Sequence, residues 1–180
     1  PQTYDSKERT FCRRYLEIGP GHGHLLVTAM ENSNYDQYIA VDISQAAVDT
    51  STAYVRYCLP ERKDFKIQHK NFFDFESSEK FHALVMGEVL EHVEDPEKFL
   101  RKIHQLAADD AFIFITTAVN APCFDHIYHF HTVEEVEAMF ARCGLYVKDK
   151  VYGIANGVTL EKAIKKKYSI VPAYVLGKAK

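Results

Sequence analysis

The sequence contains no C-x-x-C pair, no signal peptide and no long apolar run. Widely spaced cysteines favour free thiols in a reducing compartment over a disulfide framework or a paired-cysteine metal site. A chain without a long apolar run is not expected to span a membrane, so no membrane partner is predicted. We therefore expect a cytoplasmic protein whose thiols are free, at Cys12, Cys58, Cys123 and Cys143.

An excess of positive charge is also missing. The 180 residues carry 22 lysines and arginines against 25 acids, for a formal net charge of −3. A protein without a basic field is not expected to bind nucleic acid. The basic run Lys165 to Lys167 stands near an expected helix end, where cations suit the helix dipole, and we interpret it as a solvated face. No repeat, low-complexity segment or linker appears, which predicts a single domain over residues 1–180.

Short apolar runs alternate with helical patterns along most of the chain. The runs are typical of buried strands, and the intervening segments show apolar positions at helical spacing. This alternation predicts an α/β fold: a doubly wound, mostly parallel, Rossmann-like sheet with a closing antiparallel pair of strands. Strands are expected at residues 13–18, 38–42, 65–69, 81–87, 111–117, 145–152 and 169–176, with helices at 24–32, 44–57 and after residues 95 and 132.

Three glycines follow the first expected strand at alternate positions, in Glu17-Ile-Gly-Pro-Gly-His-Gly23. Glycine tolerates positive φ and lets a ligand approach the backbone closely, so a strand that ends in such a loop predicts a cofactor cradle. The dinucleotide fingerprint places glycines at the first, third and sixth positions, and the sixth position here is His24, whose side chain is expected where the helix must approach closely. An NAD-dependent oxidoreductase is therefore an alternative that His24 weakens.

The spacing E-x-G-x-G-x-G resembles the first motif of class I S-adenosylmethionine-dependent methyltransferases, which implies S-adenosylmethionine as the cofactor. Asp42 ends the second strand 19 residues after Gly23, the placement from which a carboxylate accepts both ribose hydroxyls, and Ile43 stands beside it. The residues that the resemblance places at the amino-acid end of the cofactor are Glu17, Gly19, Gly21 and Gly23.

Asn71 follows the third expected strand, where a side-chain amide can accept from the adenine amine while the backbone amide of Phe72 donates to the ring. The stretch Met86 to Val93 resembles the fourth-strand motif of the ubiquinone-biosynthesis-like branch of the same family. There, the resemblance places Gly87 and Glu88 against the cofactor, with Glu88 beside the reacting end. In doubly wound sheets such strand ends meet in one crevice, where we expect the cofactor to bind.

The pattern E-x-x-E-H also resembles the metal-binding set of small-RNA 2′-O-methyltransferases and of some quinone-pathway O-methyltransferases. A divalent metal held by Glu88, Glu91, His92 and His126 would orient and acidify a hydroxyl. The competing interpretation is that Glu91 and His92 cap and brace a helix, as in metal-free relatives with the same pair. We favour this second interpretation, and no metal is predicted.

A general base is needed only if the methyl acceptor starts protonated, because methyl transfer is an in-line displacement governed by alignment. His126, His129 and His131 are the available histidines, and His126 is preferred because it follows an acid, Asp125, that can orient its ring. With Glu88, His126 is the candidate catalytic residue.

We expect transfer to a small-molecule acceptor, with oxygen as the acceptor atom. Relatives carry helices before the first strand that cover the active site, whereas only Pro1 to Cys12 precede it here, so a short or missing N-terminal lid is expected. The alternatives are a metal-assisted RNA 2′-O-methyltransferase, an NAD-dependent oxidoreductase, and a non-catalytic domain of the same fold.

Overall fold

The computed structural model describes residues 12–155 and 157–179, and the expected lead-in and lid lie outside the described residues. Seven strands form one sheet in the order β3-β2-β1-β4-β5-β7-β6. They are β1 (Arg14–Ile18), β2 (Gln37–Asp42), β3 (Phe65–His69), β4 (Phe81–Gly87), β5 (Ala107–Thr116), β6 (Leu145–Gly153) and β7 (Val171–Lys178). Strands β1 to β5 run parallel, whereas β7 is antiparallel to both β5 and β6, so the predicted fold class is confirmed.

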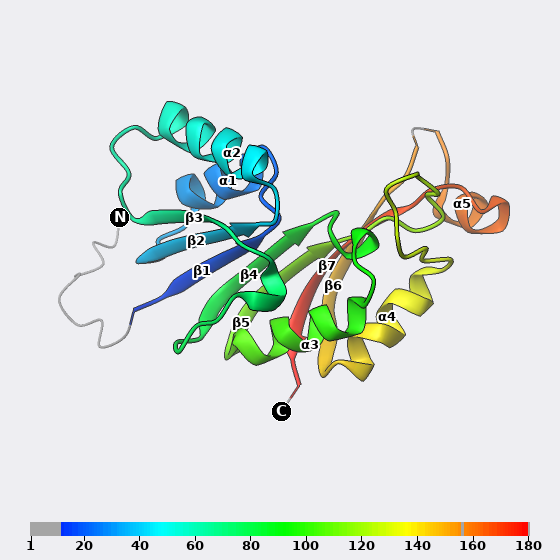
Figure 1. Cartoon of the computed structure of the whole chain (residues 1–180). Coiled ribbons are helices and arrows are strands. Elements are labelled where there is room, and N and C mark those ends of the chain that lie inside the picture. The colour runs from blue at the N-terminus through cyan, green and yellow to red at the C-terminus, as the bar shows by residue number, and fades with distance from the viewer. Residues whose placement is uncertain (1–11, 156, 180) are drawn as a thin grey trace, which may run out of the picture.

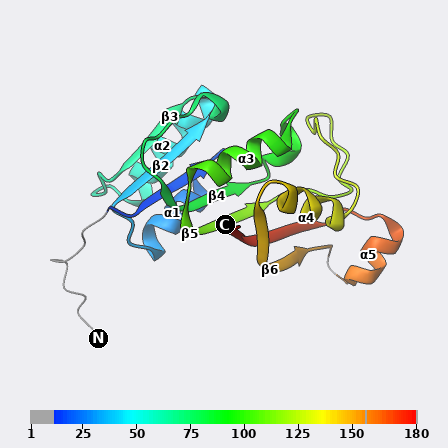
Figure 2. The same ribbon diagram turned by 90° about the horizontal axis from the view of Figure 1, so that it is seen from below.

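Helices cover both faces of this sheet. In Figures 1 and 2, α1 and α2 lie on one face, and α3 and α4 lie on the other. Side-chain caps explain several helix starts: Asp95 accepts from the N–H of Lys98 at 2.9 Å, and Thr132 accepts from that of Glu135 at 3.0 Å. The helices are α1 (His24–Asn32), α2 (Gln45–Cys58), α3 (Pro96–Leu106), α4 (Val133–Arg142) and α5 (Leu160–Lys166), with 3₁₀ turns η1 (Phe72–Asp74) and η2 (Leu90–His92).

The strand order places the topological switch between β1 and β4. From β1 the chain winds outward through β2 to β3, and it then returns to the other side of β1 as β4. Loops after neighbouring strands diverge at such a point and leave a crevice at the carboxyl ends of the strands. β1 is buried at all five residues, so the loop after it is anchored in the core.

Strand β5 begins earlier than the sequence indicated. The expected strand begins at residue 111, but β5 starts at Ala107, and its register against β4 shifts between Phe81 and Ala83. The extra residues form an irregularity in which Asp109 is exposed and pairs with Lys178 Nζ at 3.1 Å. This difference lies at the amino-terminal end of β5, away from the strand ends that form the crevice.

Two further expectations concern the described chain as a whole. Its cysteines, Cys12, Cys58, Cys123 and Cys143, are all free thiols, as the spacing predicted. Within residues 12–155 and 157–179, no helix has both the length and the apolar character needed to cross a membrane.

Candidate functional site

The carboxyl ends of β1, β2, β3 and β4 surround a cavity of about 670 Å³, which we call the crevice. The chain therefore gathers strand ends that are far apart in sequence, as the switch-point rule predicts. Of the predicted cofactor residues, Glu17 and Gly23 are absent from its lining. Those that line it are Gly19, Gly21, Asp42, Ile43, Asn71, Phe72, Gly87 and Glu88.

The glycine loop needs its glycines for two different reasons. Gly19 has a φ of +68°, and a Cβ atom there would lie 2.6 Å from Cγ2 of Val89. Gly23 has a φ of +87°, and its Cβ would lie 3.1 Å from that of Ser51, so it permits the contact between the start of α1 and helix α2. The close approach between α1 and α2 thus occurs at Gly23, one residue before His24. His24, expected to crowd this approach, is instead exposed and packs edge-on against Tyr54, with ring centroids 4.7 Å apart.

Glu17 lies on the α1 side of the sheet. It is 1% exposed, and one carboxyl oxygen accepts a hydrogen bond from the Tyr15 hydroxyl at 2.6 Å. Burial raises the pKa of this carboxyl to about 7, although the hydrogen bond from Tyr15 acts in the opposite direction. Glu17 does not line the crevice, and its predicted role at the amino-acid end of the cofactor stays a prediction.

Asp42 and Ile43 form one wall of the crevice. Asp42 is half-buried, and its Oδ1 atom accepts from the backbone N–H of Ser44 at 2.8 Å. Its backbone oxygen accepts from the N–H of Lys70 at 2.8 Å, which ties the end of β2 to the segment after β3. Ile43 is 69% exposed. The site thus offers a fixed carboxylate beside an open apolar surface, a combination suited to a ribose and the base attached to it.

Asn71 caps η1 next to this wall. Its Oδ1 atom accepts from the N–H of Phe73 at 2.9 Å, and the first N–H groups of a helical turn have no partner within the turn. The N–H of Phe72 is such a group. The Phe72 ring itself belongs to the core, with its centroid 4.5 Å from that of Phe99. Phe73, half-buried at the crevice, is the better placed of the two rings to contact a base.

Glu88 occupies a strained position at the end of β4. Its φ is +51°, a conformation that side-chain-bearing residues rarely adopt, and its N–H donates to the carbonyl of Thr116 at 3.1 Å. Burial raises the pKa of the Glu88 carboxyl and repulsion from Glu91 adds to this rise, while a hydrogen bond with Thr116 and the neighbouring His126 oppose it. Strain of this kind is concentrated at functional sites.

Glu91, His92 and His126 come together beside the crevice. One potential ligand atom from each lies within 4.8 Å of the others, and Glu88 is not part of this cluster. Glu91 is 1% exposed; its Oε2 atom accepts from the Thr117 hydroxyl at 2.8 Å, whereas Oε1 is buried without a hydrogen-bond partner among the described residues. The predicted bracing role of Glu91 therefore explains the hydrogen bond at Oε2 and leaves the buried Oε1 atom unexplained.

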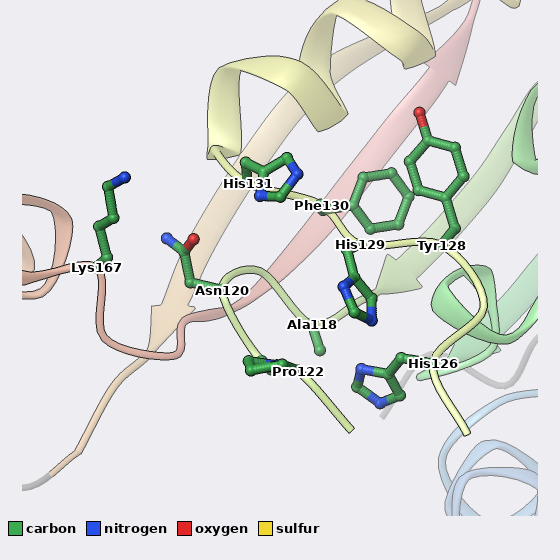
Figure 3. A pocket seen from close by; sticks show the side chains of 10 residues that line it. Ala118, Asn120, Pro122, His126, Tyr128, His129, Phe130, His131 and Lys167 are labelled. Carbon is green, nitrogen blue, oxygen red and sulfur yellow. The ribbon is translucent and has the colours of Figure 1, made fainter. Parts of the chain in front are cut away.

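His92 and His126 connect the crevice to a second, smaller cavity. Their rings pack edge to face with centroids 5.0 Å apart; His92 lines the crevice and His126 lines a cavity of about 260 Å³ (Figure 3). Nδ1 of His92 lies 2.8 Å from the carbonyl oxygen of Asp125, which fixes that ring if this nitrogen carries the proton. We call the smaller cavity the histidine pocket. Asn120 also lines it.

Several residues at the crevice were missed by sequence reasoning. Ile127 is 62% exposed and reaches the crevice from the segment between β5 and α4, and Lys70, Val89 and Val93 also line it. Lys70 directly precedes Asn71, so its position at the end of the third expected strand could have predicted that it lines the crevice. Ile127 carried no such signal, because its position depends on how the long segment after β5 folds back.

Comparison with known proteins shows the family and the fold of the chain. Residues 6–150 match a protein family described as a methyltransferase domain, and no curated protein sequence matches the chain. At 16% identity the chain is similar to the N-methyltransferase NodS from Bradyrhizobium japonicum WM9 in complex with S-adenosylhomocysteine, with a TM-score of 0.71 over 92% of this chain and 78% of that one.

Two more solved structures show the same fold. An S-adenosylmethionine-dependent methyltransferase from Clostridium acetobutylicum ATCC 824 is 11% identical, with a TM-score of 0.71 over 94% of this chain and 85% of that one. The StiE O-methyltransferase region is 14% identical, with a TM-score of 0.72 over 94% of this chain and 68% of that one. The family match covers most of the described strands and helices, and the protein therefore belongs to the methyltransferase domain family, with the fold of class I S-adenosylmethionine-dependent methyltransferases.

Proposed function

We propose that this protein transfers the methyl group of S-adenosylmethionine to an oxygen of a small molecule. The observation that carries the proposal is the crevice itself, where Asp42, Asn71 and the loop at Gly19 line one cavity. In this arrangement Asp42 accepts from the ribose hydroxyls, and Asn71 with the Phe72 amide binds adenine. The glycine loop receives the amino-acid end, with Glu17 in the strand before it.

The acceptor is proposed to lie where the crevice meets the histidine pocket. Glu88 and His126 stand at this boundary, and they are the groups placed to take up a proton from a hydroxyl. Fold alone does not identify the acceptor atom, since the similar structures include both an N-methyltransferase and an O-methyltransferase by name. Transfer to oxygen requires that the hydroxyl lose its proton, and these two titratable groups can accept it. We also place the chain in the ubiquinone-biosynthesis-like branch, on the stretch Met86 to Val93.

Calorimetry with three ligands tests the cofactor assignment. S-adenosylmethionine and S-adenosylhomocysteine are expected to bind with one-to-one stoichiometry, and NAD is expected not to bind. Incubation with S-adenosylmethionine and a panel of small phenols and alcohols should then release S-adenosylhomocysteine. NAD binding without S-adenosylmethionine binding would support an oxidoreductase, and failure to bind any of the three ligands would support a non-catalytic domain.

A divalent metal is a second candidate for the acceptor side, favoured by the buried, unpartnered Oε1 atom of Glu91. A buried carboxylate oxygen without a donor is costly, and a cation would satisfy it. Glu91, His92 and His126 would provide one oxygen and two nitrogen ligands, a set suited to zinc or manganese. Such an ion would supply Lewis acidity to the acceptor hydroxyl. The carbonyl of Asp125 would orient His92 so that its Nε2 faces the ion.

Metal analysis separates this candidate from the metal-free mechanism. Protein dialysed against Zn²⁺ or Mn²⁺ should retain about one ion per chain. His92→Asn should bind that ion at least about 100-fold more weakly, because loss of a ligand should cost no less than loss of an outer-shell partner, which costs about 10–100-fold. His104→Asn, on α3 and outside the cluster, is the matched control and should bind the ion as the wild type does. Equal metal retention in His92→Asn and the wild type, or activity unchanged by a chelator, would exclude a metal role.

A further inference from the structure

The histidine pocket is lined by hydrogen-bond donors that come from two separate parts of the chain. Lys167 follows α5, and the other lining residues lie in the segment between β5 and α4 (Figure 3). Asn120 lies between Lys167 and the histidines in this view. No acid is found among the described residues that line the pocket. The polar ones are Asn120, His126, Tyr128, His129, His131 and Lys167.

The backbone holds Asn120 and Lys167 in an uncommon conformation. In the described chain, the residues other than glycine that have positive φ are Glu88 at +51°, Asn120 at +51° and Lys167 at +54°. Glu88 lines the crevice, and the other two line the histidine pocket. Such conformations cost about 1–3 kcal/mol each and persist where the surroundings enforce them, often at ligand sites. The conformation of Lys167 is the left-handed cap that commonly ends a helix, here α5, so among the pocket residues Asn120 is the one whose backbone marks the site.

The two parts of the pocket are fixed to each other by backbone hydrogen bonds. Val119 and Ile170 exchange N–H to carbonyl bonds of 2.8 and 2.9 Å, and the N–H of Asn120 donates to Phe130 at 2.9 Å. These bonds join the residues next to Asn120 to the turn that carries Lys167. The backbone segments that carry Lys167, Asn120 and the histidines are therefore fixed around one space before a ligand arrives, which lowers the entropic cost of binding.

The pocket also has an apolar side. Tyr128 and Phe130 pack with ring centroids 4.7 Å apart, and Ala118, Ala121 and Pro122 complete the lining. A volume of about 260 Å³ is slightly below the usual range for ligand sites, so the pocket accommodates one small molecule or group. Donors and apolar groups in one lining match a small molecule with an apolar body and one anionic group, since cationic donors favour oxyanions.

The pocket adjoins the place where methyl transfer is proposed. His126 belongs to its lining, and the next residue, Ile127, lines the crevice. A ligand whose anionic group contacts Lys167 and Asn120 would extend past His126 toward the cofactor. We propose that the methyl acceptor is a small, apolar or aromatic molecule that carries a carboxylate or phosphate, and that Lys167 and Asn120 bind this anionic group. This inference rests on the proposed function for the identity of the ligand as acceptor.

Ring-proton NMR of the histidines tests the pocket directly. The probes are benzoate, phenyl phosphate and the neutral benzamide, each titrated into the full chain. Benzoate, phenyl phosphate or both should shift the signals of His129 and His131, and benzamide should not. Lys167→Asn keeps a residue type that tolerates positive φ and should weaken anion binding about tenfold, as expected for loss of one charge-assisted hydrogen bond. Lys166→Asn removes the same charge from the preceding position of α5, outside the lining, and should bind as the wild type does.

Each outcome of this experiment decides the inference. A response to only one of the two anions identifies the group as carboxylate or phosphate. Equal binding of benzamide, absence of any shift with both anions, or equal weakening in Lys166→Asn and Lys167→Asn would overturn the proposal. S-adenosylmethionine binding, measured by calorimetry in the same variants, should stay unchanged. Its absence from the wild type would contradict the proposed function and leave the result on anion binding intact.

Discussion

Asp42→Asn is expected to weaken S-adenosylmethionine binding about 100-fold. The carboxylate is proposed to accept from both ribose hydroxyls, and hydrogen bonds to a charged acceptor contribute about 1.5–3 kcal/mol each. An amide keeps one oxygen, which the N–H of Ser44 already contacts at 2.8 Å, and presents donors where the hydroxyls need acceptors. Calorimetric titration of the variant with S-adenosylmethionine measures the change.

The matched control for Asp42→Asn is Asp49→Asn. Asp49 is an exposed acid on α2 that accepts from the Gln45 side chain at 2.8 Å and does not line the crevice. Both substitutions remove one negative charge from neighbouring parts of the chain. Asp49→Asn should bind S-adenosylmethionine as the wild type does. Wild-type affinity in Asp42→Asn, or equal losses in the two variants, would show that Asp42 does not bind the ribose.

The free energy of unfolding is expected to fall by about 3 kcal/mol as the pH rises from about 5 to about 8, through the ionisation of Glu17. Burial raises the pKa of this carboxyl from 4.5 to about 7, so the folded chain holds a proton that the unfolded chain has already lost. The stabilisation is complete below the unfolded pKa and disappears as the pH passes the folded one. Glu88, whose pKa is also raised, contributes with the same sign.

Urea unfolding at both pH values measures this effect. Glu17→Gln cannot ionise, and its carbonyl can still accept from the Tyr15 hydroxyl, so its unfolding free energy should depend much less on pH. Glu31→Gln, an exposed acid on α1, is the control and should keep the wild-type dependence. If Glu17→Gln retains the full decrease between these pH values, the buried carboxyl is not its source.

Local patterns predicted the secondary structure well because the signals are short in range. The capping residues Ser44, Asp95 and Thr132 start helices α2, α3 and α4 where the sequence placed them. The main departure is the start of β5 at Ala107. Pairing with neighbouring strands decides where such an irregular strand begins, and the residue pattern of the strand itself does not show it. His24 illustrates the same limit: its position in the motif was read correctly, but the direction of its ring depends on Tyr54 of another helix.

The strand ends could be assigned to one crevice because the topology of a doubly wound sheet brings them together whatever the loops do. The sequence by itself therefore determined the fold class and the residues at the crevice, such as Gly19, Asp42 and Asn71. Only the tertiary structure decided that Glu17 is buried outside the crevice lining, that one oxygen of Glu91 lacks a partner, and that Lys167 shares a pocket with Asn120. The physical reason is that burial and contacts between distant segments depend on the packing of the whole chain, which no local spacing encodes.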